Sequence, residues 1–199
     1  MNEARRAAGR AVVYLAIGLQ MSGCGSLLAA LNAEPIREDP GERTFAARVS
    51  DEMIETKAVV NIHAADERFD GAHLEVVSYN GFVLLAGQVE SEALKARAAD
   101  VVRRIREVRR IYNELEVASP SSSMTRASDS WISAKVKATL LGRRDTEGTR
   151  VKVVTENGVV YLLGLVTREE ADRVAAVAAE VGGVQKVVKL FELIGDGIT

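Results

Sequence analysis

Residues 76–89 read VVSYNGFVLLAGQV and residues 153–166 read VVTENGVVYLLGLV, so one apolar, glycine-containing pattern occurs twice in the chain. In each copy an Asn-Gly pair separates two runs rich in β-branched and apolar residues, which is the strongest short-range signal for a β-hairpin. A type I′ turn needs positive φ at both central residues, and Asn and Gly adopt it at low cost. The offset of about 77 residues is larger than that of solenoid repeats and indicates a duplicated small domain.

The residues around each hairpin predict the same order of elements in both copies. A helix precedes the hairpin, and a second helix with one apolar face and a closing strand follow it. The expected leading helices cover residues 43–57 and 129–141, the latter with Ser128 or Asp129 as its cap. The expected hairpin strands are 74–79 with 82–89 and 151–156 with 159–166, and the closing strands are 109–117 and 186–193. The predicted fold class is therefore α+β, with two tandem αββαβ domains, each a small mixed three-stranded sheet packed against two helices.

The N-terminal residues have the composition of an export signal. Arg5, Arg6 and Arg10 precede an apolar run over residues 11–19, which is followed by Ser22, Gly23 and Cys24. A run of roughly 10 apolar residues is too short to span a bilayer as a helix but suits a signal peptide. A buried core helix or a retained N-terminal anchor is the alternative reading.

Cys24 is the single cysteine in the chain of 199 residues, so it cannot form an intramolecular disulfide. Its thiol is a suitable nucleophile for taking a diacylglycerol group, and two buried acyl chains suffice for stable anchoring. The stretch Met21-Ser22-Gly23-Cys24 resembles the lipobox of bacterial lipoproteins, with Met at a position where Leu is usual. Gly25 follows the cysteine, and the absence of Asp there implies, by this resemblance, transport to the outer membrane.

These segments divide the chain into six parts. They are a signal peptide (1–23), a lipid-anchored tether (24–42), a first domain (43–118), a linker (119–127), a second domain (128–194) and a tail (195–199).

The duplicated domain resembles a known family. The αββαβ order, the second copy's motif Asn-Gly-Val-Val-x-Leu-x-Gly-x-Val and the closing Val-x-x-Val strand resemble the BON domain. Further matching stretches are Ile111-Tyr112-Asn113-Glu114, Asp129-Ser130-Trp131-Ile132 and Gly164-Leu165-Val166-Thr167. Two such domains behind a lipobox are similar to the dual BON-domain outer-membrane lipoproteins, over about residues 43 to 194.

The sequence shows no pattern that indicates catalysis or a bound cofactor. His63 and His73 do not form a metal-spaced pair, and His63 beside Asp66 is more typical of a structural contact. The hairpin glycines do not open a helix as phosphate-binding loops do, and Gly87 and Gly164 are expected where a strand approaches a helix. Gly81 and Gly158 are turn residues. We therefore expect no enzyme, no metal and no cofactor.

The helix expected over residues 129–141 carries the candidate binding site. At about 100° per residue, Ile132, Val136, Thr139 and Leu140 form the core stripe, and Trp131 lies off it. A tryptophan among lysines, outside the core, is typical of a helix at a membrane surface. The alternative is that Trp131 packs against the other domain or the linker. In the resembling lipoproteins this helix contacts anionic phospholipid, which implies Trp131, Lys135 and Leu141 as phospholipid-binding residues. Lys137, which lies beside Leu141 on the remaining flank of the helix, is added as a further cation of the same site.

Two further patterns leave alternatives open. Arginines 97, 103, 104, 106, 109 and 110 form either a solvated, ion-paired face or a second anionic-lipid surface. Strand 159–166 is apolar on both faces, with Val160, Leu162 and Val166 expected toward the helices. The second face must also be covered, either by the other domain or linker or by a partner protein.

The sequence thus predicts a non-enzymatic, lipid-anchored protein on the periplasmic face of the outer membrane. It would bind anionic phospholipid, such as phosphatidylglycerol, through its second domain. The resemblance further implies a role in envelope integrity at the division site, with a division or peptidoglycan-remodelling protein as a possible partner. The alternatives are a periplasmic stress protein acting on unfolded envelope proteins and a peptidoglycan- or secretin-associated scaffold. The net charge of -2 and the export signal argue against nucleic acid as a partner.

The first prediction concerns the anchor. Labelled palmitate should enter the wild-type chain, and Cys24→Ser should abolish the labelling because no other thiol is present. Labelling that survives the substitution would contradict the assignment of a lipoprotein.

Overall fold

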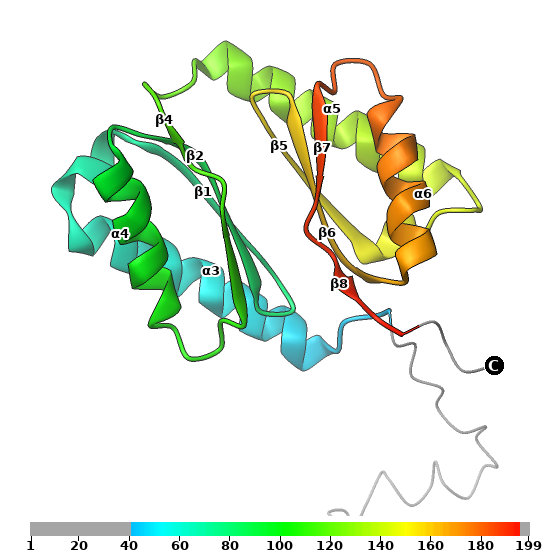
Figure 1. Cartoon of the computed structure of the whole chain (residues 1–199), viewed down its shortest axis with the longest axis horizontal. Helices are drawn as coiled ribbons and strands as arrows, with labels where there is room; N and C mark the ends of the chain where they lie inside the picture. The colour runs from blue at the N-terminus through cyan, green and yellow to red at the C-terminus, as the bar shows by residue number, and fades with distance from the viewer. Residues whose placement is uncertain (1–40, 196–199) are drawn as a thin grey trace, which may run out of the picture. The chain divides into compact units, whose positions relative to one another are not determined.

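The computed structural model describes residues 41–195, which form two αββαβ domains (Figure 1). The predicted signal peptide, Cys24, most of the tether and most of the tail lie outside the described residues. The first domain consists of α3 (Phe45–Ala65), η2 (Glu67–Gly71), β1 (His73–Tyr79), β2 (Phe82–Val89), α4 (Glu92–Arg103), β3 (Arg110–Asn113) and β4 (Glu116–Val117). The second consists of α5 (Ser123–Gly142), η3 (Gly148–Arg150), β5 (Val151–Glu156), β6 (Val159–Val166), α6 (Arg168–Ala179), β7 (Lys186–Lys189) and β8 (Glu192–Leu193).

Each sheet has its hairpin's second strand in the centre. β2 pairs antiparallel with β1 and parallel with β3 and β4, and β6 pairs in the same way with β5, β7 and β8. The expected single closing strand is therefore two short strands in each domain. Buried Leu115 lies in the interruption in the first domain, and buried Phe191 lies in that of the second. Pairing with the central strand keeps one register across the break, because Phe82 faces Arg110 and Gln88 faces Glu116.

Both hairpins have the predicted turn. φ is 52° at Asn80 and 76° at Gly81, and it is 48° at Asn157 and 75° at Gly158. Tyr79 pairs with Phe82, and Glu156 pairs with Val159, so each turn contains only the Asn-Gly pair. These are type I′ turns, whose twist matches that of the strands.

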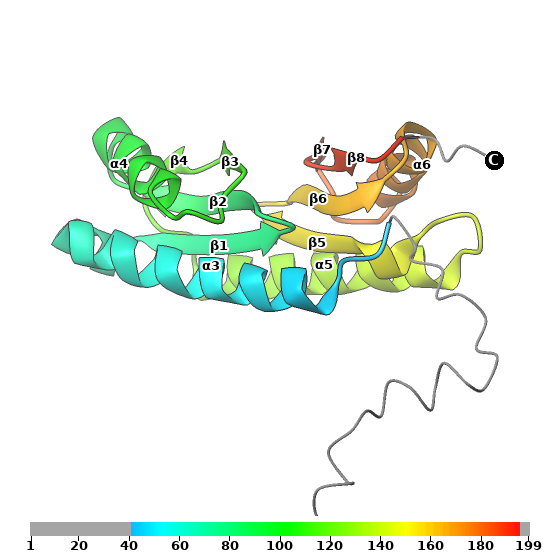
Figure 2. The ribbon, with the colours of Figure 1, turned by 90° about the horizontal axis from the view of Figure 1, so that it is seen from below.

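Each domain has a core between its helices and one sheet face. In the first domain Ile54, Ala58 and Ile62 of α3 pack with residues of α4, β1 and β2. In the second domain Ile132, Val136 and Leu140 of α5 pack with α6 and with Val160, Leu162 and Val166 of β6, which are the three residues predicted to face the helices. Figure 2 shows α3 beside β1 and α5 beside β5, with both long helices on the same side of the sheets.

The second face of each sheet packs against the other domain. A third apolar cluster combines Val77, Tyr79, Leu84 and Ala86 of the first domain with residues of the second, namely Val154, Tyr161, Leu163, Leu165 and Leu190. Of the two covers considered for strand 159–166, the structure therefore supports the other domain.

Three local expectations were wrong. The leading helices are longer than predicted: α3 continues to Ala65 because buried Ile62 extends the i, i+4 stripe, and α5 begins at Ser123, capped by Ser122. Thr139 is exposed and donates to the Lys135 carbonyl, so it is not a core residue. Gly87 lies against strand backbone and not against a helix, because an added Cβ would lie 2.0 Å from the oxygen of His73 in β1; at Gly164 the added Cβ would lie 2.8 Å from the oxygen of Arg150, the last residue of η3.

The turn geometry makes a stability prediction. Gly158→Val should lower the free energy of unfolding by about 1–3 kcal/mol, because a β-branched residue is forced to positive φ. Gly182→Val is the matched control, since Gly182 has open space around it and is not among the positive-φ glycines. Equal melting temperatures of the two variants would contradict this role for Gly158.

Candidate functional site

The outer face of α5 is an exposed apolar stripe. Met124 is 80%, Trp131 66% and Leu141 52% exposed. Exposed Ala127, Ala134 and Ala138 lie between them at helical spacing on the same side. Ile132, Val136 and Leu140 occupy the opposite, buried side. Trp131 thus packs neither in the core nor against the first domain, and the stripe has the composition of a surface that contacts another apolar phase.

Asp129 fixes the N-terminal half of α5 to the second hairpin. Its carboxylate is buried and accepts hydrogen bonds from the backbone N–H groups of Asn157 and Gly158, each at 2.9 Å. The sequence predicts Asp129 only as a possible helix cap. Its actual contact joins positions about 28 residues apart, and a helical period gives no signal for such a contact. Asp129 therefore orients the turn of the helix that carries Trp131.

Asp51 holds the same position in the first domain. It accepts hydrogen bonds from the N–H groups of Asn80 and Gly81, at 2.8 and 2.9 Å, and from the Ser78 hydroxyl at 2.7 Å. Burial raises its pKa, but these hydrogen bonds and that from Arg43 outweigh burial, so the pKa lies below its ordinary value of 3.8. Each hairpin is therefore held to the first helix of its domain by one buried carboxylate.

The two lysines predicted for the lipid site are engaged within the second domain. Lys137 donates to the carbonyl oxygens of Gly148 and Val151, at 2.7 and 2.6 Å, and burial lowers its pKa. Lys135 donates to the Gly182 carbonyl from a more exposed position. Lys137 consequently stabilises the connection from α5 to β5, and the structure does not place its ammonium group on the outer stripe with Trp131.

Two arginines follow α5 at its C-terminal end. Arg143 forms a bidentate contact with Asp145, with both distances 3.0 Å. Arg144 is exposed, and within residues 41–195 no ion pair is found for it. This arginine is the cation nearest in sequence to Leu141 that has no partner among the described residues. The positive charge available beside the stripe is therefore smaller than the sequence suggested.

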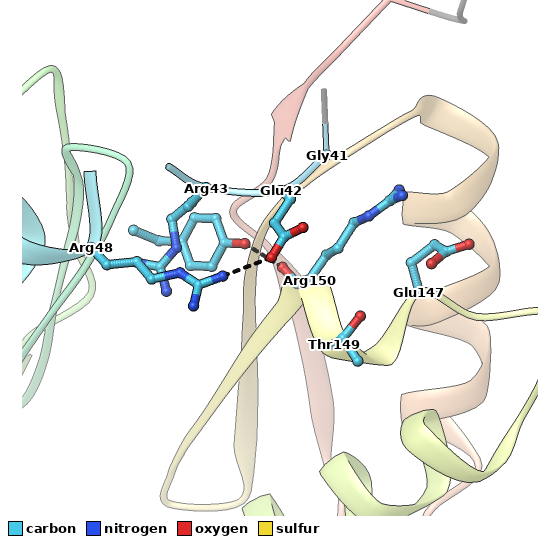
Figure 3. Close-up of a pocket in the computed structure, with 8 residues that line it drawn as sticks. Gly41, Glu42, Arg43, Arg48, Glu147, Thr149 and Arg150 are labelled. Atoms are coloured by element: carbon cyan, nitrogen blue, oxygen red, sulfur yellow. Dashed lines mark hydrogen bonds and ion pairs between the residues drawn. The ribbon is translucent and has the colours of Figure 1, made fainter. Parts of the chain in front are cut away.

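A pocket of about 490 Å³ opens where the two domains meet (Figure 3). Arg43, Arg48 and Arg150 line it with Glu42, Glu147, Thr149, Gly41 and Tyr79. Each arginine has an acidic partner: Arg43 with Asp51 at 2.6 Å, Arg48 with Glu42 at 3.0 Å and Arg150 with Glu170 at 3.6 Å. Internal pairing accounts for these charges, so the pocket is weaker evidence for a ligand than the stripe on α5.

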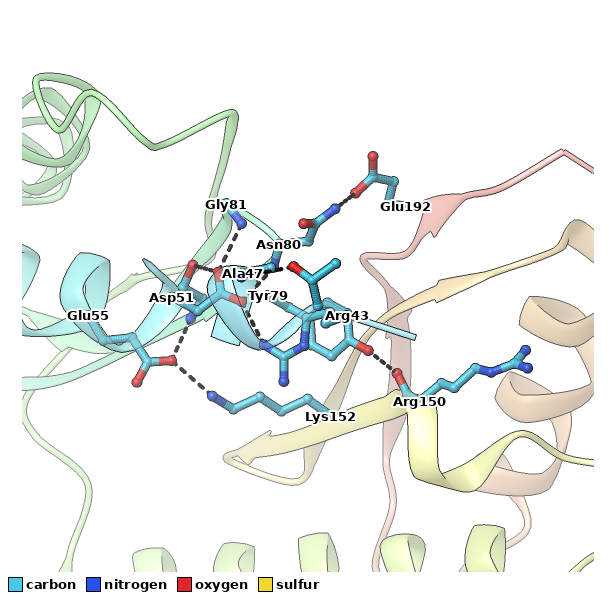
Figure 4. Close-up of polar contacts among 12 residues, drawn as sticks. Arg43, Ala47, Asp51, Glu55, Tyr79, Asn80, Gly81, Arg150, Lys152 and Glu192 are labelled. Atoms are coloured by element: carbon cyan, nitrogen blue, oxygen red, sulfur yellow. Dashed lines mark hydrogen bonds and ion pairs between the residues drawn. The ribbon is translucent and has the colours of Figure 1, made fainter. Parts of the chain in front are cut away.

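Several polar contacts join the two domains, among them Asn80 with Glu192, Tyr79 with Arg150 and Lys152 with Glu55 (Figure 4). Asn80 donates to Glu192 at 2.7 Å, and the equivalent Asn157 donates to Glu116 at 3.2 Å. The Tyr79 hydroxyl donates to the Arg150 carbonyl at 2.6 Å. The equivalent pair is Glu156 and His73, whose Nε2 lies 3.1 Å from the Glu156 carboxylate. These two contacts thus each have a counterpart with the roles of the domains exchanged.

Several of the remaining candidate residues have structural partners. His63 contacts Asp70 at 3.0 Å, and not Asp66. Buried Glu156 also accepts a hydrogen bond from Gln88, at 2.7 Å. Of the six arginines considered as one surface, Arg109 forms a bidentate ion pair with Glu192 of the other domain and Arg103 pairs with Asp100. No group of residues suited to holding a metal occurs within residues 41–195, and no helix there is long and apolar enough to cross a bilayer.

Comparison with known families assigns both domains to one family. The model of the BON domain matches residues 50–119 and again residues 128–195. The chain belongs to the BON-domain family. Its two BON domains are those predicted from the duplicated hairpin.

Named relatives share most of the chain. It is 33% identical to "Outer membrane lipoprotein DolP" of Haemophilus influenzae, over 92% of this chain and 94% of that protein. It is 34% identical to the "21 kDa hemolysin" of Actinobacillus pleuropneumoniae, over 76% and 78%. It is 29% identical to "Osmotically-inducible protein Y" of Escherichia coli, over 82% and 85%. The chain thus resembles an outer-membrane lipoprotein in sequence over both BON domains.

The position of Lys137 makes a prediction. Lys137→Gln should lower the stability of the second BON domain, because the shorter amide side chain cannot keep both carbonyl contacts. It should leave vesicle binding of the folded protein unchanged. Arg144→Gln is the contrasting variant, with unchanged melting and weaker binding to anionic vesicles. Thermal melting and vesicle co-sedimentation measure the two effects. Normal stability with lost vesicle binding in Lys137→Gln would show that its ammonium group contacts lipid.

Proposed function

We propose that the chain is a non-enzymatic lipoprotein, anchored through Cys24 on the periplasmic face of the outer membrane, whose second BON domain binds anionic phospholipid. The outer stripe of α5 is the binding surface, with Trp131 at its centre and Leu141 toward its C-terminal end. A phosphatidylglycerol-like lipid is the proposed ligand. The observation that carries the proposal is the exposure of Trp131 within a helix face that is apolar from Met124 to Leu141.

The apolar residues supply most of the expected attraction. Removing one large apolar side chain from water contributes on the order of 1.5–3 kcal/mol. A Lys or Arg near an anionic surface contributes about 1 kcal/mol. Because Lys137 is engaged internally, apolar insertion should dominate, and the charge of Arg144 should add a smaller preference for anionic headgroups.

With the proposed lipid anchor in place, a weak contact between α5 and the bilayer is sufficient to keep the second BON domain on the membrane. A lipid on Cys24 would hold the second BON domain near the bilayer, so its binding becomes effectively intramolecular. The anchor then determines the membrane, and α5 determines how the domain lies on it. Envelope integrity at the division site is the cellular role that the family resemblance implies, with a division or peptidoglycan-remodelling protein as partner.

A periplasmic stress protein is the second candidate. The similarity to "Osmotically-inducible protein Y" supports it, because the alignment covers 82% of this chain. On this alternative the stripe of α5 would contact exposed apolar segments of unfolded envelope proteins. The two candidates differ in whether lipid alone engages Trp131.

Trp131→Glu tests the proposal. The free energy of unfolding of the variant should lie within about 0.5 kcal/mol of the wild-type value, because an exposed position is changed. It should bind anionic vesicles far more weakly, because a carboxylate replaces the apolar ring and is repelled by lipid phosphate. Ala176→Glu, on the exposed face of α6, is the control with the same change of charge and should bind normally.

Fluorescence gives an independent measurement, because Trp131 is the only tryptophan. Its emission should shift to the blue when anionic vesicles are added. An emission that responds to unfolded protein but not to vesicles would favour the stress-protein candidate.

A further inference from the structure

The first BON domain also has an exposed apolar stripe, on the outer face of α3. Phe45 is 82%, Met53 50% and Val60 61% exposed, and Val49 lies between the first two. At about 100° per residue these four side chains project on one side of the helix, opposite the buried Ile54, Ala58 and Ile62. Val49, Met53 and Thr56 line a shallow hollow of about 430 Å³ on this face, flanked by Glu52 and Lys57. Apolar surface of this extent on one helix indicates a contact with something outside the domain.

The duplication places this stripe at the positions used in α5. Met53 follows Asp51 by two residues, as Trp131 follows Asp129, and both aspartates hold the Asn-Gly turn of their own domain. Counted from these aspartates, Val49 is equivalent to Ala127, and Val60 is equivalent to Ala138. The two helices therefore expose apolar residues at equivalent places of one fold.

The arrangement of the domains places the two helices that carry the stripes along one side of the sheets. Figure 2 shows α3 and α5 on the same side of the two sheets. Each stripe lies opposite the core residues of its helix, so its own domain does not cover it. The apolar cluster between the domains holds the helices in this arrangement.

The position of α3 along the chain also favours a bilayer as the surface that contacts its stripe. The segment from Cys24 joins the described structure at Gly41, and α3 begins at Phe45. The seventeen residue steps from Cys24 to Gly41 span at most about 60 Å in any conformation. The helix that follows the proposed lipid attachment most directly is therefore one with an apolar outer face.

The charges on α3 distinguish it from α5. Arg48 pairs with Glu42 at 3.0 Å, and Lys57 pairs with Glu107 at 3.2 Å. These pairs leave little local positive charge to attract anionic headgroups. A contact made by α3 should therefore depend on apolar insertion and be insensitive to the headgroup charge.

From these observations we propose that the outer face of α3 is a second membrane contact, lying on the same bilayer as α5. This second contact rests on the proposed function, since it assumes the lipid anchor at Cys24 and the contact of α5 with the bilayer. The occupant of the stripe is the acyl and interfacial region of the lipid, and the two helices together would lay the long side of the BON pair on the membrane.

The test moves the single tryptophan from α5 to α3. Trp131→Phe keeps α5 apolar, and Met53→Trp then makes α3 the only source of indole fluorescence. Asn61→Trp in the same background is the matched control, because Asn61 is exposed on α3 about 120° away from the middle of the stripe. The full chain is reconstituted into phosphatidylethanolamine vesicles, with and without phosphatidylglycerol, that contain brominated acyl chains. Wild type, with Trp131 in place, reports on α5 in parallel.

The proposal expects bromine to quench most of the emission of the Met53→Trp variant in both lipid mixtures, and to leave the Asn61→Trp variant largely unquenched. Adding Val60→Asp should restore much of the lost emission, whereas Asn61→Asp should not. Circular dichroism and melting confirm that each variant is folded.

The contrary outcomes are distinct. Quenching of Trp131 in wild type without quenching in the Met53→Trp variant overturns the α3 contact and leaves the proposed function standing. Absence of quenching at both positions overturns both. A blue shift of the Met53→Trp variant in detergent that grows with protein concentration shows that a second copy covers α3, and it also overturns the proposal.

Discussion

The packing of two apolar sheet faces against each other is the constraint on which the structure depends. Side chains alternate along a strand, so a strand that is apolar on both faces needs two covers. In each BON domain the helices cover one face, and Leu84 and Leu163 lie fully buried on the other. Neither domain can keep that second face in water without exposing a continuous apolar surface. The duplication solves this because each copy supplies the cover that the other lacks. Two polar contacts at the margin follow the same exchange of roles, Tyr79 with Arg150 and Glu156 with His73.

This packing decides which surfaces remain for function. Once both sheet faces are buried, the outer faces of the helices are left to meet solvent or a partner. Asp51 and Asp129 then fix the rotation of α3 and α5, because each carboxylate must face the N–H groups of its hairpin turn. A residue two positions further along the helix cannot also face the core. The exposure of Trp131 thus follows from the turn that Asp129 holds, and not from a lack of apolar surface to pack against.

Much of this could be predicted from local sequence. The Asn-Gly turns depend on two residues, and the split of β6 between two apolar faces depends on a period of two, so both were predicted correctly. The position of Trp131 off the core stripe follows from the helical period. The roles of Lys137 and Glu156 could not be predicted, because their partners are set by tertiary packing: a long lysine side chain reaches carbonyls beyond its helix, and Glu156 meets His73 of the other domain. The start of α5 was missed because Ser122 and Ser128 both offer a capping hydroxyl, and Ser122 is the one used.

The two copies keep the residues that build the fold and differ in those that face outward. Asp51 and Asp129 make the same contacts, whereas Met53 stands where the second domain has Trp131. An indole has a polar N–H as well as an apolar ring and suits the headgroup region, whereas a thioether chain has only apolar surface to offer. Lys57 is paired with Glu107, while Arg144 beside the end of α5 has no acidic partner in the described part of the chain. On the proposed function, α5 would therefore give selectivity for anionic lipid, and α3 would add apolar attachment without selectivity. Tethered contacts of this kind reinforce one another, because each raises the local concentration of the other. With no spanning helix in residues 41–195, the proposed lipid anchor alone would attach the chain, and the two helix contacts would orient it on the bilayer.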